Sequence, residues 1–380
     1  METFSEWRQS NGQPYLYAQG SSRYELGVAK GYGMAAQILD FQSAIDQGIS
    51  AALAKKPEAK KKTEELIDAY LTLIPDDDLI EIKGMADGYN RALDAGNLHR
   101  IQIQGLTSKE SWDKKIKPSP RKLTWQELAV HSFMIELVSR LRSEKINLFE
   151  GCTSFVSVNA DGSVVQGQNY DTRMNGYGSM AYCLQRCEEE PTEFLLQSGA
   201  SLAWAVGKSE YGILLNLSTV RTNLDIPICT PRSVLIRQAM RQLIAEAAVK
   251  AMSDPQGHTP VPFNFMISDR HTAFGVQARP EQQKISRVRS TLVQSNRYSD
   301  LAWRQYMKDP SYSLERQLFA ERLLASVRAQ NGGSITENDL IRILQTKPVI
   351  CRPTTVFFLT RQHFGIGNPA DQPVGEIPDV

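Results

Sequence analysis

The spacing of apolar residues changes near Gly151, and this change limits the folds open to the chain. Before this point the sequence is rich in Ala, Leu, Lys and Glu and has mainly helical spacing. After it, short runs typical of strands are separated by turn dipeptides, with helices between groups of strands. Hairpins with segregated helices favour an α+β fold over a repeated βαβ unit. We expect one layered domain made of an N-terminal segment, residues 1–151, and a C-terminal segment, residues 152–380.

Two helices of the N-terminal segment have clear boundaries in the sequence. Thr124 and Glu127 form a capping box, which predicts a helix that begins there and continues with a broad apolar stripe. A second helix is predicted over Lys60–Leu73. Pro75 and the acidic run Asp76–Asp78 close this helix, and we expect a turn after it.

The C-terminal segment is predicted to open with a hairpin. Its strands are Thr153–Val158 and Ser163–Gln168, joined by a turn that contains Asp161-Gly162. The further predicted strands are Glu193–Gln197, Leu202–Val206, Tyr211–Leu217, Phe263–Ile267, Ala273–Gln277 and Thr354–Thr360. The predicted helices are one long helix from the Thr230-Pro231 cap to Ala251, then Ser313–Val327 and Thr336–Leu344.

Composition excludes several classes of partner. Lys and Arg total 43 against 42 Asp and Glu, a net charge of +1, so no global field attracts nucleic acid or anionic lipid. The start of the chain has no apolar signal region, and no later run approaches the length of a membrane span. Five cysteines without paired spacing favour neither a disulfide framework nor a zinc site. We therefore expect a cytoplasmic, reducing location.

Familiar cofactor motifs are missing from the sequence. It contains no phosphate loop, no dinucleotide fingerprint, no His-Glu-x-x-His and no Gly-x-Ser-x-Gly string. The five histidines include no pair at metal-ligand spacing, and Cys183 and Cys187 are too few ligands for zinc. The basic run at residues 55–62 precedes Glu64 and Glu65 and is interpreted as the solvated start of a helix. We expect no metal and no organic cofactor.

Cys152 stands at the junction of the two segments, where chain cleavage would have a chemical consequence. Cutting before Cys152 would make it the first residue of a strand and give it a free α-amino group. Such a group has a pKa of about 7.7–8.0, so it can take the proton of the thiol on the same residue. Nucleophile and base then need no separate histidine. The alternative is a buried structural cysteine after a loop glycine.

The residues around this junction resemble the signature of the acyl-coenzyme A:isopenicillin N acyltransferase family, which belongs to the N-terminal nucleophile hydrolases. The resemblance rests on Gly151-Cys152-Thr153-Ser154-Phe155 followed by Gln166-Gly167-Gln168-Asn169-Tyr170-Asp171. Tyr24–Gly31, Glu81–Gly88 and Asn264–Gly275 are similar to further landmarks of that family. The resemblance implies a four-layer αββα sandwich and an inactive precursor that cuts itself between Gly151 and Cys152.

The resemblance also implies roles for four residues. Cys152 matches the nucleophile and Asp171 the acidic residue beside it. Asn296 resembles the asparagine whose amide helps to form the oxyanion hole, and Arg352 resembles the arginine that pairs with the acid. From the residues alone, Asp171 could instead cap a turn, Asn296 could lie in a loop, and Arg352 could be a solvated strand end.

The expected activity is that of a self-processing N-terminal cysteine amidohydrolase or acyltransferase. It would cleave a small-molecule amide or acyl thioester through a Cys152 acyl-enzyme and pass the acyl group to water or an amine. One alternative is a ceramidase-like or bile-acid-amidase-like hydrolase of lipid amides. Another is an uncleaved, non-catalytic binding protein of the same fold. Neither the acyl group, the acceptor nor the oligomeric state follows from the sequence.

Overall fold

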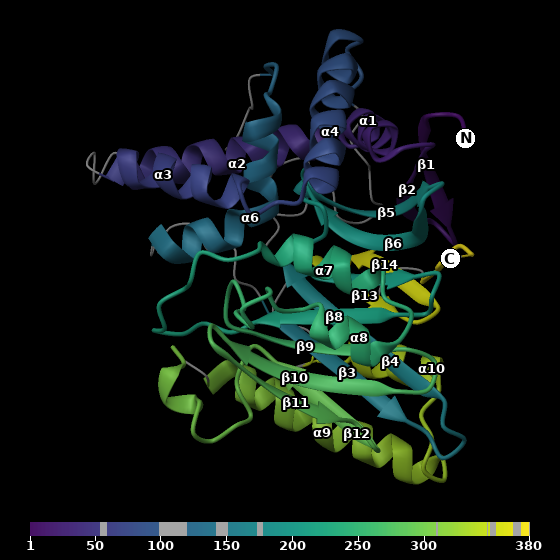
Figure 1. Ribbon diagram of the computed structural model, residues 1–380. Helices are drawn as coiled ribbons and strands as arrows, with labels where there is room; N and C mark the ends of the chain where they lie inside the picture. Colours follow the sequence, from purple (N-terminus) through teal and green to yellow (C-terminus); the bar gives the residue numbers. More distant parts are fainter. Residues whose placement is uncertain are drawn as a thin grey trace.

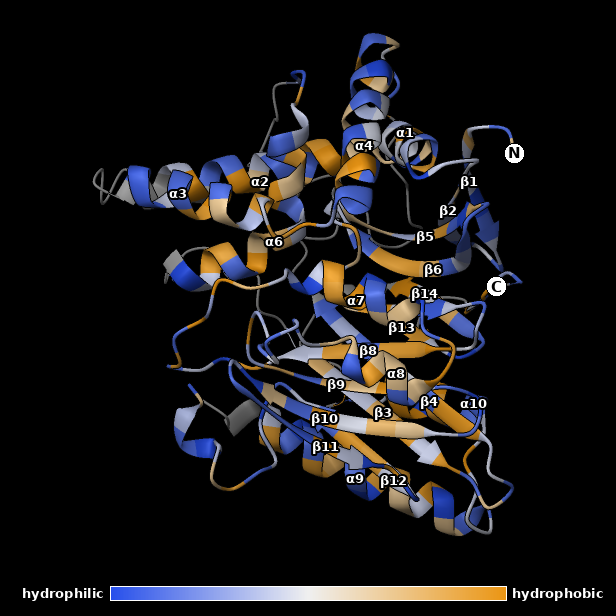
Figure 2. Cartoon of the chain, in the orientation of Figure 1, coloured by the Kyte–Doolittle hydropathy of each residue, from blue (hydrophilic) through white to orange (hydrophobic). Residues whose placement is uncertain are grey.

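Two β-sheets lie face to face and helices cover their outer faces (Figure 1). This computed structural model describes residues 1–53, 59–98, 120–141, 151–172, 178–308, 311–347, 349, 355–367 and 374–379. Hydrophobic residues are concentrated in the strands, for example along β6, while hydrophilic residues recur along α3 and α9 (Figure 2). The largest cluster of buried apolar side chains extends from the helices of the N-terminal segment into both sheets.

The larger sheet has nine strands in the order β1-β2-β5-β6-β7-β8-β9-β10-β11. All neighbours in it are antiparallel except β2 and β5, which are parallel. The strands are β1 (Phe4–Ser10), β2 (Gln13–Gly20), β5 (Met180–Cys187), β6 (Glu190–Ser198), β7 (Val206–Ser209), β8 (Leu214–Thr219), β9 (Phe263–Ser268), β10 (Ala273–Arg279) and β11 (Gln282–Arg287). Both segments of the chain therefore contribute strands to one sheet.

The smaller sheet has six antiparallel strands in the order β12-β3-β4-β13-β14-β15. They are β12 (Thr291–Ser295), β3 (Cys152–Val158), β4 (Val164–Thr172), β13 (Thr355–Thr360), β14 (His363–Gly367) and β15 (Gly375–Glu376). Two glutamines of β4 cross to the larger sheet: Gln166 Nε2 donates to Leu214 O at 3.1 Å, and Gln168 Nε2 donates to Leu217 O at 2.7 Å. These bonds satisfy buried amides and fix how β4 faces β8.

Helices form the two outer layers. On the larger sheet α1 (Arg23–Gly33) packs against β2, and α7 (Arg232–Met240) and α8 (Ala245–Lys250) pack against β7 to β10. On the smaller sheet α9 (Ser311–Gln330) packs on β12 and α10 (Glu337–Gln345) on β4. The remaining helices are α2 (Ala35–Leu53), α3 (Ala59–Leu71), α4 (Asp76–Asp94), α6 (Trp125–Leu141) and the short η2 (Arg304–Tyr306). The α+β class and the αββα layering are confirmed. Across the described ranges, no helix combines the length and apolarity that a membrane span requires.

Much of the predicted secondary structure is confirmed. The capping box at Thr124 is present, with Glu127 N–H donating to Thr124 Oγ1 at 3.3 Å and Thr124 N–H to Glu127 Oε2 at 2.8 Å. The first hairpin is β3 and β4, and its turn includes Gly162 at φ +82°. Strands β9, β10 and β13 and helices α3, α9 and α10 match their predicted positions to within a few residues.

Two predicted elements are wrong. The turn predicted after the helix at Lys60–Leu73 is present at Thr72 and Leu73, and Asp76–Asp78 then form the first turn of α4, where carboxylates are favoured by the helix dipole. The long helix from Thr230 is two helices, because Asp269 Oδ2 accepts the Ala245 N–H and starts α8 anew. Leu202–Val206 is not a strand before Val206, since the Leu202 N–H donates to Ser132 Oγ on α6 at 3.3 Å instead of to a neighbouring strand.

A tight pair of helices builds the outer layer of the N-terminal segment. Helices α1 and α4 cross above β5 and β6 (Figure 1). Glycines spaced four residues apart on both helices make their contact surface: Gly27, Gly31, Gly84 and Gly88. A Cβ atom on any of them would overlap a backbone carbonyl of the partner helix; at Gly31 that carbonyl belongs to Met85. Backbone atoms cannot rotate away, so this close approach requires glycine.

We expect Gly31→Ala to lower the free energy of unfolding by about 2–4 kcal/mol, because the two helices must move apart to admit the methyl group. Urea unfolding followed by circular dichroism measures this change. Arg91→Ala, at an exposed position of α4, is the control and should shift the value by less than about 0.5 kcal/mol. Equal stability of the two variants would contradict a close-packed glycine contact.

A buried ion network joins the N-terminal segment to the C-terminal segment. Lys30 Nζ lies 2.6 Å from Glu81 Oε1, and Arg237 Nη1 lies 3.2 Å from Glu81 Oε2; all three side chains are fully buried. Arg237 Nε also lies 2.9 Å from Glu193 Oε2. Burial opposes the charged form of Glu81, but Arg237 and Lys30 outweigh it and lower the pKa of Glu81 to about 2.

This pKa predicts how stability depends on pH. The folded chain binds fewer protons at Glu81 than the unfolded chain, so its contribution is complete above about pH 4.5 and is lost as pH falls toward 2. We expect Glu81→Gln to cost about 3–5 kcal/mol at pH 7, because it removes the carboxylate that pairs with Lys30 and one of those that pair with Arg237, and the gap to wild type to narrow below pH 4.5. Urea unfolding across this pH range measures both effects, with exposed Glu64→Gln as control. A gap that stays constant from pH 7 to pH 3 would exclude this role for Glu81.

Candidate active site

Cys152 is the first residue of β3, a strand inside the smaller sheet. Its side chain is 3% exposed, and its Cα partner in β4 is Tyr170. Ser154 lies on the same face of β3 as Cys152, and its Oγ donates to Gln168 Oε1 of β4. The amide nitrogen of Gln168 in turn donates to the larger sheet. Because alternate residues of a strand share a face, Cys152 points to the space between the two sheets. The junction of the two segments therefore lies in the interior of the sandwich.

The peptide unit between Gly151 and Cys152 is held by hydrogen bonds on both sides. Gly151 O accepts the backbone N–H of Asp171 at 2.7 Å. The N–H of Cys152 donates to Asn296 Oδ1 at 2.6 Å. The carbonyl oxygen of this peptide thus faces a donor, and its nitrogen faces an acceptor, which fixes the plane of the bond that the sequence predicts to be cut.

Asn296 is positioned by the end of β12. It follows Ser295, the last residue of that strand, and β12 pairs with β3 in antiparallel register. Its Nδ2 donates to Thr219 O at 3.0 Å, at the end of β8 in the other sheet. The amide of Asn296 therefore bridges the two sheets beside Cys152.

The structure brings together Cys152, Asp171 and Asn296, with the Asp171 contact made by its backbone. Asp171 lies near the end of β4, pairs with Val356 of β13 and has a fully buried side chain. Arg352 lies outside the described residues, so its predicted pairing stays a prediction. The roles of these four residues are taken up below as proposals.

Arg316 of α9 is a site residue that the sequence reasoning missed. Its side chain is 1% exposed. Nη1 donates to Cys152 O at 2.7 Å and to Thr153 Oγ1 at 2.7 Å, while Nη2 donates to Asn296 Oδ1 at 3.0 Å. Arg316 stands four and eight residues before Ala320 and Leu324, which share its helix face and are buried, but α9 has too little apolar periodicity for this position to stand out in the sequence.

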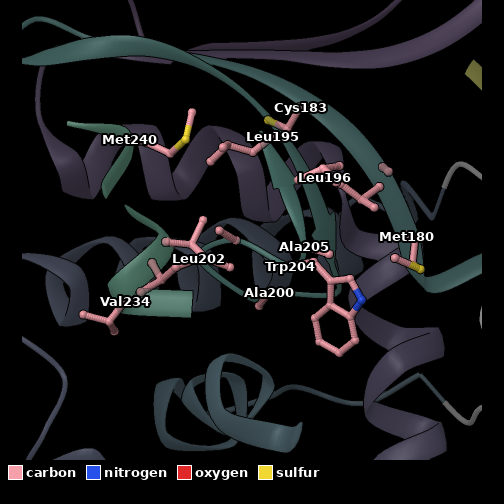
Figure 3. Packing of buried hydrophobic residues seen from close by; sticks show 14 of the residues in the cluster. Met180, Cys183, Leu195, Leu196, Ala200, Leu202, Trp204, Ala205, Val234 and Met240 are labelled. Atoms are coloured by element: carbon pink, nitrogen blue, oxygen red, sulfur yellow. The ribbon is translucent and has the colours of Figure 1, made fainter. Parts of the chain in front are cut away.

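An aromatic pair lies next to the cysteine. Tyr170 OH accepts a hydrogen bond from Trp204 Nε1 at 2.7 Å. Trp204 belongs to a buried apolar cluster with Leu196, Ala205 and Met180 (Figure 3). The polar edge of the indole is thus directed at Tyr170, and its apolar body is packed in the core.

His131, one of the five histidines, has a structural place. Its Nε2 lies 2.9 Å from Gln42 Oε1, and its Nδ1 accepts the N–H of Ala200 at 2.9 Å. Burial lowers the pKa of His131 to about 3, so the ring is neutral at physiological pH. It joins α2, α6 and the turn after β6.

Other polar clusters in the described part of the chain do not form a metal site. No group of three His, Cys, Asp or Glu side chains there is arranged to hold a metal ion. Cys183 and Cys187 lie in β5 and are buried. Burial raises the pKa of Cys183 to about 12, which keeps its thiol protonated.

Comparison with known proteins gives structural neighbours only. No protein-family model matches the chain, and no curated protein matches its sequence. One similar solved structure is a Caenorhabditis elegans ortholog of N-acylethanolamine-hydrolyzing acid amidase, with 17% identity, a TM-score of 0.44, and coverage of 60% of this chain and 100% of that one. Penicillin V acylase from Agrobacterium tumefaciens has 13% identity, a TM-score of 0.36, and coverage of 57% and 84%. A mutant of conjugated bile acid hydrolase from Clostridium perfringens has 11% identity, a TM-score of 0.35, and coverage of 60% and 96%.

The arrangement around Cys152 has the parts that acyl transfer needs. A thiol lies at the start of a strand, an amide and a guanidinium contact its backbone, and a backbone N–H faces the preceding carbonyl oxygen. Hydrogen-bond donors fixed in a buried site stabilise a developing oxyanion without reorganising.

We expect Arg316→Met to lower the free energy of unfolding by about 2–4 kcal/mol, because it removes a charged donor from buried oxygens of Cys152, Thr153 and Asn296. Arg316→Lys should lower the free energy of unfolding by less, because its ammonium group replaces some of the hydrogen-bond donors of the guanidinium. Arg322→Met, exposed on the same helix, is the matched control. If the two Arg→Met variants unfold at the same urea concentration, Arg316 does not hold the site.

Proposed function

We propose that the chain is a self-processing N-terminal cysteine amidohydrolase or acyltransferase. The observation that carries the proposal is the constrained peptide between Gly151 and Cys152, whose oxygen faces the Asp171 N–H and whose nitrogen faces Asn296. The resemblance of the surrounding residues to the isopenicillin N acyltransferase signature supports the same interpretation. In this proposal Cys152 is the nucleophile and Gly151-Cys152 the cleavage site.

The first reaction is cleavage of the chain. The thiol sulfur of Cys152 adds to the carbonyl carbon of Gly151, and the Asp171 N–H stabilises the negative charge on the oxygen. The carbon–nitrogen bond then breaks, the nitrogen takes up a proton, and a thioester joins Gly151 to the sulfur. Water hydrolyses the thioester, which gives a Gly151 carboxylate and a Cys152 with free amine and thiol.

The second reaction acts on an external substrate. The new α-amino group, with an ordinary pKa of about 7.7–8.0, takes the thiol proton as the sulfur attacks an amide or thioester carbonyl. Asn296 supplies an amide near the developing oxyanion, and Arg316 holds the Asn296 carbonyl. The leaving amine or thiol departs with the proton, and water or an amine then accepts the acyl group from Cys152.

The remaining predicted roles belong to the same proposal. Asp171 is the acidic residue beside the nucleophile, and Arg352 is its pairing partner. The sequence before Cys152, residues 1–151, becomes a separate chain, and residues 152–380 bear the nucleophile. The proposed substrate is a small-molecule amide or acyl thioester, handled without a metal or organic cofactor.

We expect wild-type protein to give two masses, for residues 1–151 and 152–380, and Cys152→Ala to give one uncut chain. Intact-protein mass spectrometry measures this directly, because removal of the thiol removes the only atom proposed to attack Gly151. Cys229→Ala, which changes another buried cysteine, is the control and should still be cut.

The substrates that the protein turns over distinguish the alternative functions. Turnover of N-acyl lipids would favour a lipid amide hydrolase, and turnover of coenzyme A thioesters would favour an acyltransferase. A wild-type chain that stays uncut and turns over neither class, yet binds a ligand equally well after Cys152→Ala, would identify a non-catalytic binding protein and refute the proposed enzyme.

A further inference from the structure

Arg232, the first residue of α7, is a buried cation to which no described residue gives a carboxylate partner. Its side chain is 4% exposed. Nη1 makes one long contact, 3.4 Å to Thr219 Oγ1, and the guanidinium carbon lies 5.2 Å from the centre of the Trp204 ring. Among the residues that the structure describes, no carboxylate oxygen lies within 4.0 Å of this guanidinium. Arg237 on the same helix, by contrast, has Glu81, Glu190 and Glu193 as partners.

Two chains of contacts connect Arg232 to Cys152. Thr219 accepts from Arg232 with its hydroxyl and from Asn296 with its carbonyl, and Asn296 bonds the Cys152 N–H. On the other side, Arg232 lies over Trp204, whose indole donates to Tyr170, the β4 partner of Cys152. The guanidinium therefore lies beside the nucleophile, at the end of β8.

A buried guanidinium that no described carboxylate neutralises is costly, which points to an anionic partner. Burial lowers the pKa of Arg232, whereas the charges of Glu136, Tyr170 and Cys152 raise it. Glu136, whose charge acts on Arg232, accepts the backbone N–H of Arg232 at 2.7 Å. The guanidinium fork itself keeps donors that the described residues do not use, and such a fork matches the two oxygens of a carboxylate.

We propose that Arg232 binds the carboxylate of the substrate next to the bond that Cys152 attacks. This inference rests on the proposed function and narrows its substrates to acyl compounds that bear a carboxylate close to the scissile bond, such as N-acyl amino acids. The substrate then supplies the ion-pair partner that the described residues do not provide. Arg232 is a specificity-determining residue, and a neutral amide of the same shape is a poor substrate.

The first test uses iodoacetate and iodoacetamide, which have the same shape and differ in having a carboxylate or a carboxamide. In both reactions the Cys152 sulfur forms a bond to the CH₂ carbon and iodide leaves. Mass spectrometry of the Cys152 peptide gives the ratio of the two alkylation rates. We expect this ratio to exceed that of free cysteine in wild type and to fall at least about tenfold in Arg232→Gln, the factor that one charge-assisted hydrogen bond supplies.

Two variants control this experiment. Arg232→Lys keeps the charge and should keep most of the ratio, and Arg289→Gln removes an exposed charge and should leave the ratio unchanged. A wild-type ratio no higher than that of free cysteine, an equal ratio in wild type and Arg232→Gln, or no alkylation of Cys152 by either reagent would overturn the proposal. The wild-type comparison needs no variant, so it decides the question even if Arg232→Gln fails to fold.

The second test compares turnover of N-decanoylglycine and N-decanoylglycinamide. We expect wild type to prefer the carboxylate and Arg232→Gln to lose at least about tenfold in kcat/KM for it while changing little for the amide. If the chain is cut and turns over both compounds equally, the carboxylate site at Arg232 is contradicted and the proposed enzyme function still stands. An uncut chain without turnover, but with an alkylation ratio that depends on Arg232, contradicts the proposed function and leaves the anion site supported.

Discussion

Buried charges that have to be paired connect the two segments of this chain. Lys30 and Glu81 come from helices of the N-terminal segment, and Arg237 and Glu193 come from the C-terminal segment. Each charge is fully or almost fully buried, so separating the segments would expose four ions that now neutralise one another. The parallel pairing of β2 with β5 adds a second connection. The N-terminal segment is therefore part of the sandwich, and a cut at Gly151-Cys152 would break one peptide bond without releasing it.

Sequence reasoning found the elements whose signals are local. Capping at Thr124, the short strand-like runs of β3 and β9, and the turn at Gly162 depend on a few neighbouring residues. The hairpin of β1 and β2 also had such a signal, Asn11-Gly12 with both residues at positive φ, but the helical composition around it obscured it. The breaks at Leu202 and Ala245 could not be predicted, because their causes, Ser132 and Asp269, are remote in sequence.

The difference between local signals and contacts that are remote in sequence also applies to the candidate site. Cys152 could be named from its place at the junction of the two segments, and Asp171 and Asn296 because the short motifs around them resemble a family signature. Arg316 lies in a helix whose polar and apolar residues give little periodicity, and its partners at 152, 153 and 296 are more than a hundred residues away or in another layer. The segments Tyr24–Gly31 of α1 and Glu81–Gly88 of α4 can each be recognised in the sequence, but only the fold shows that their glycines face each other.

Two buried arginines beside Cys152 illustrate how one type of side chain can serve two purposes. Arg316 directs its donors to the protein itself, to Cys152 O, Thr153 Oγ1 and Asn296 Oδ1, so its charge is used to hold the nucleophile and the amide in place. Arg232 has an aromatic ring on one side and a single long contact to Thr219. Holding a guanidinium in the core without a carboxylate from the described residues costs free energy. An anion that enters with the substrate would recover it at the moment of binding, which makes the two arginines parts of one site, one for the chain and one for the ligand.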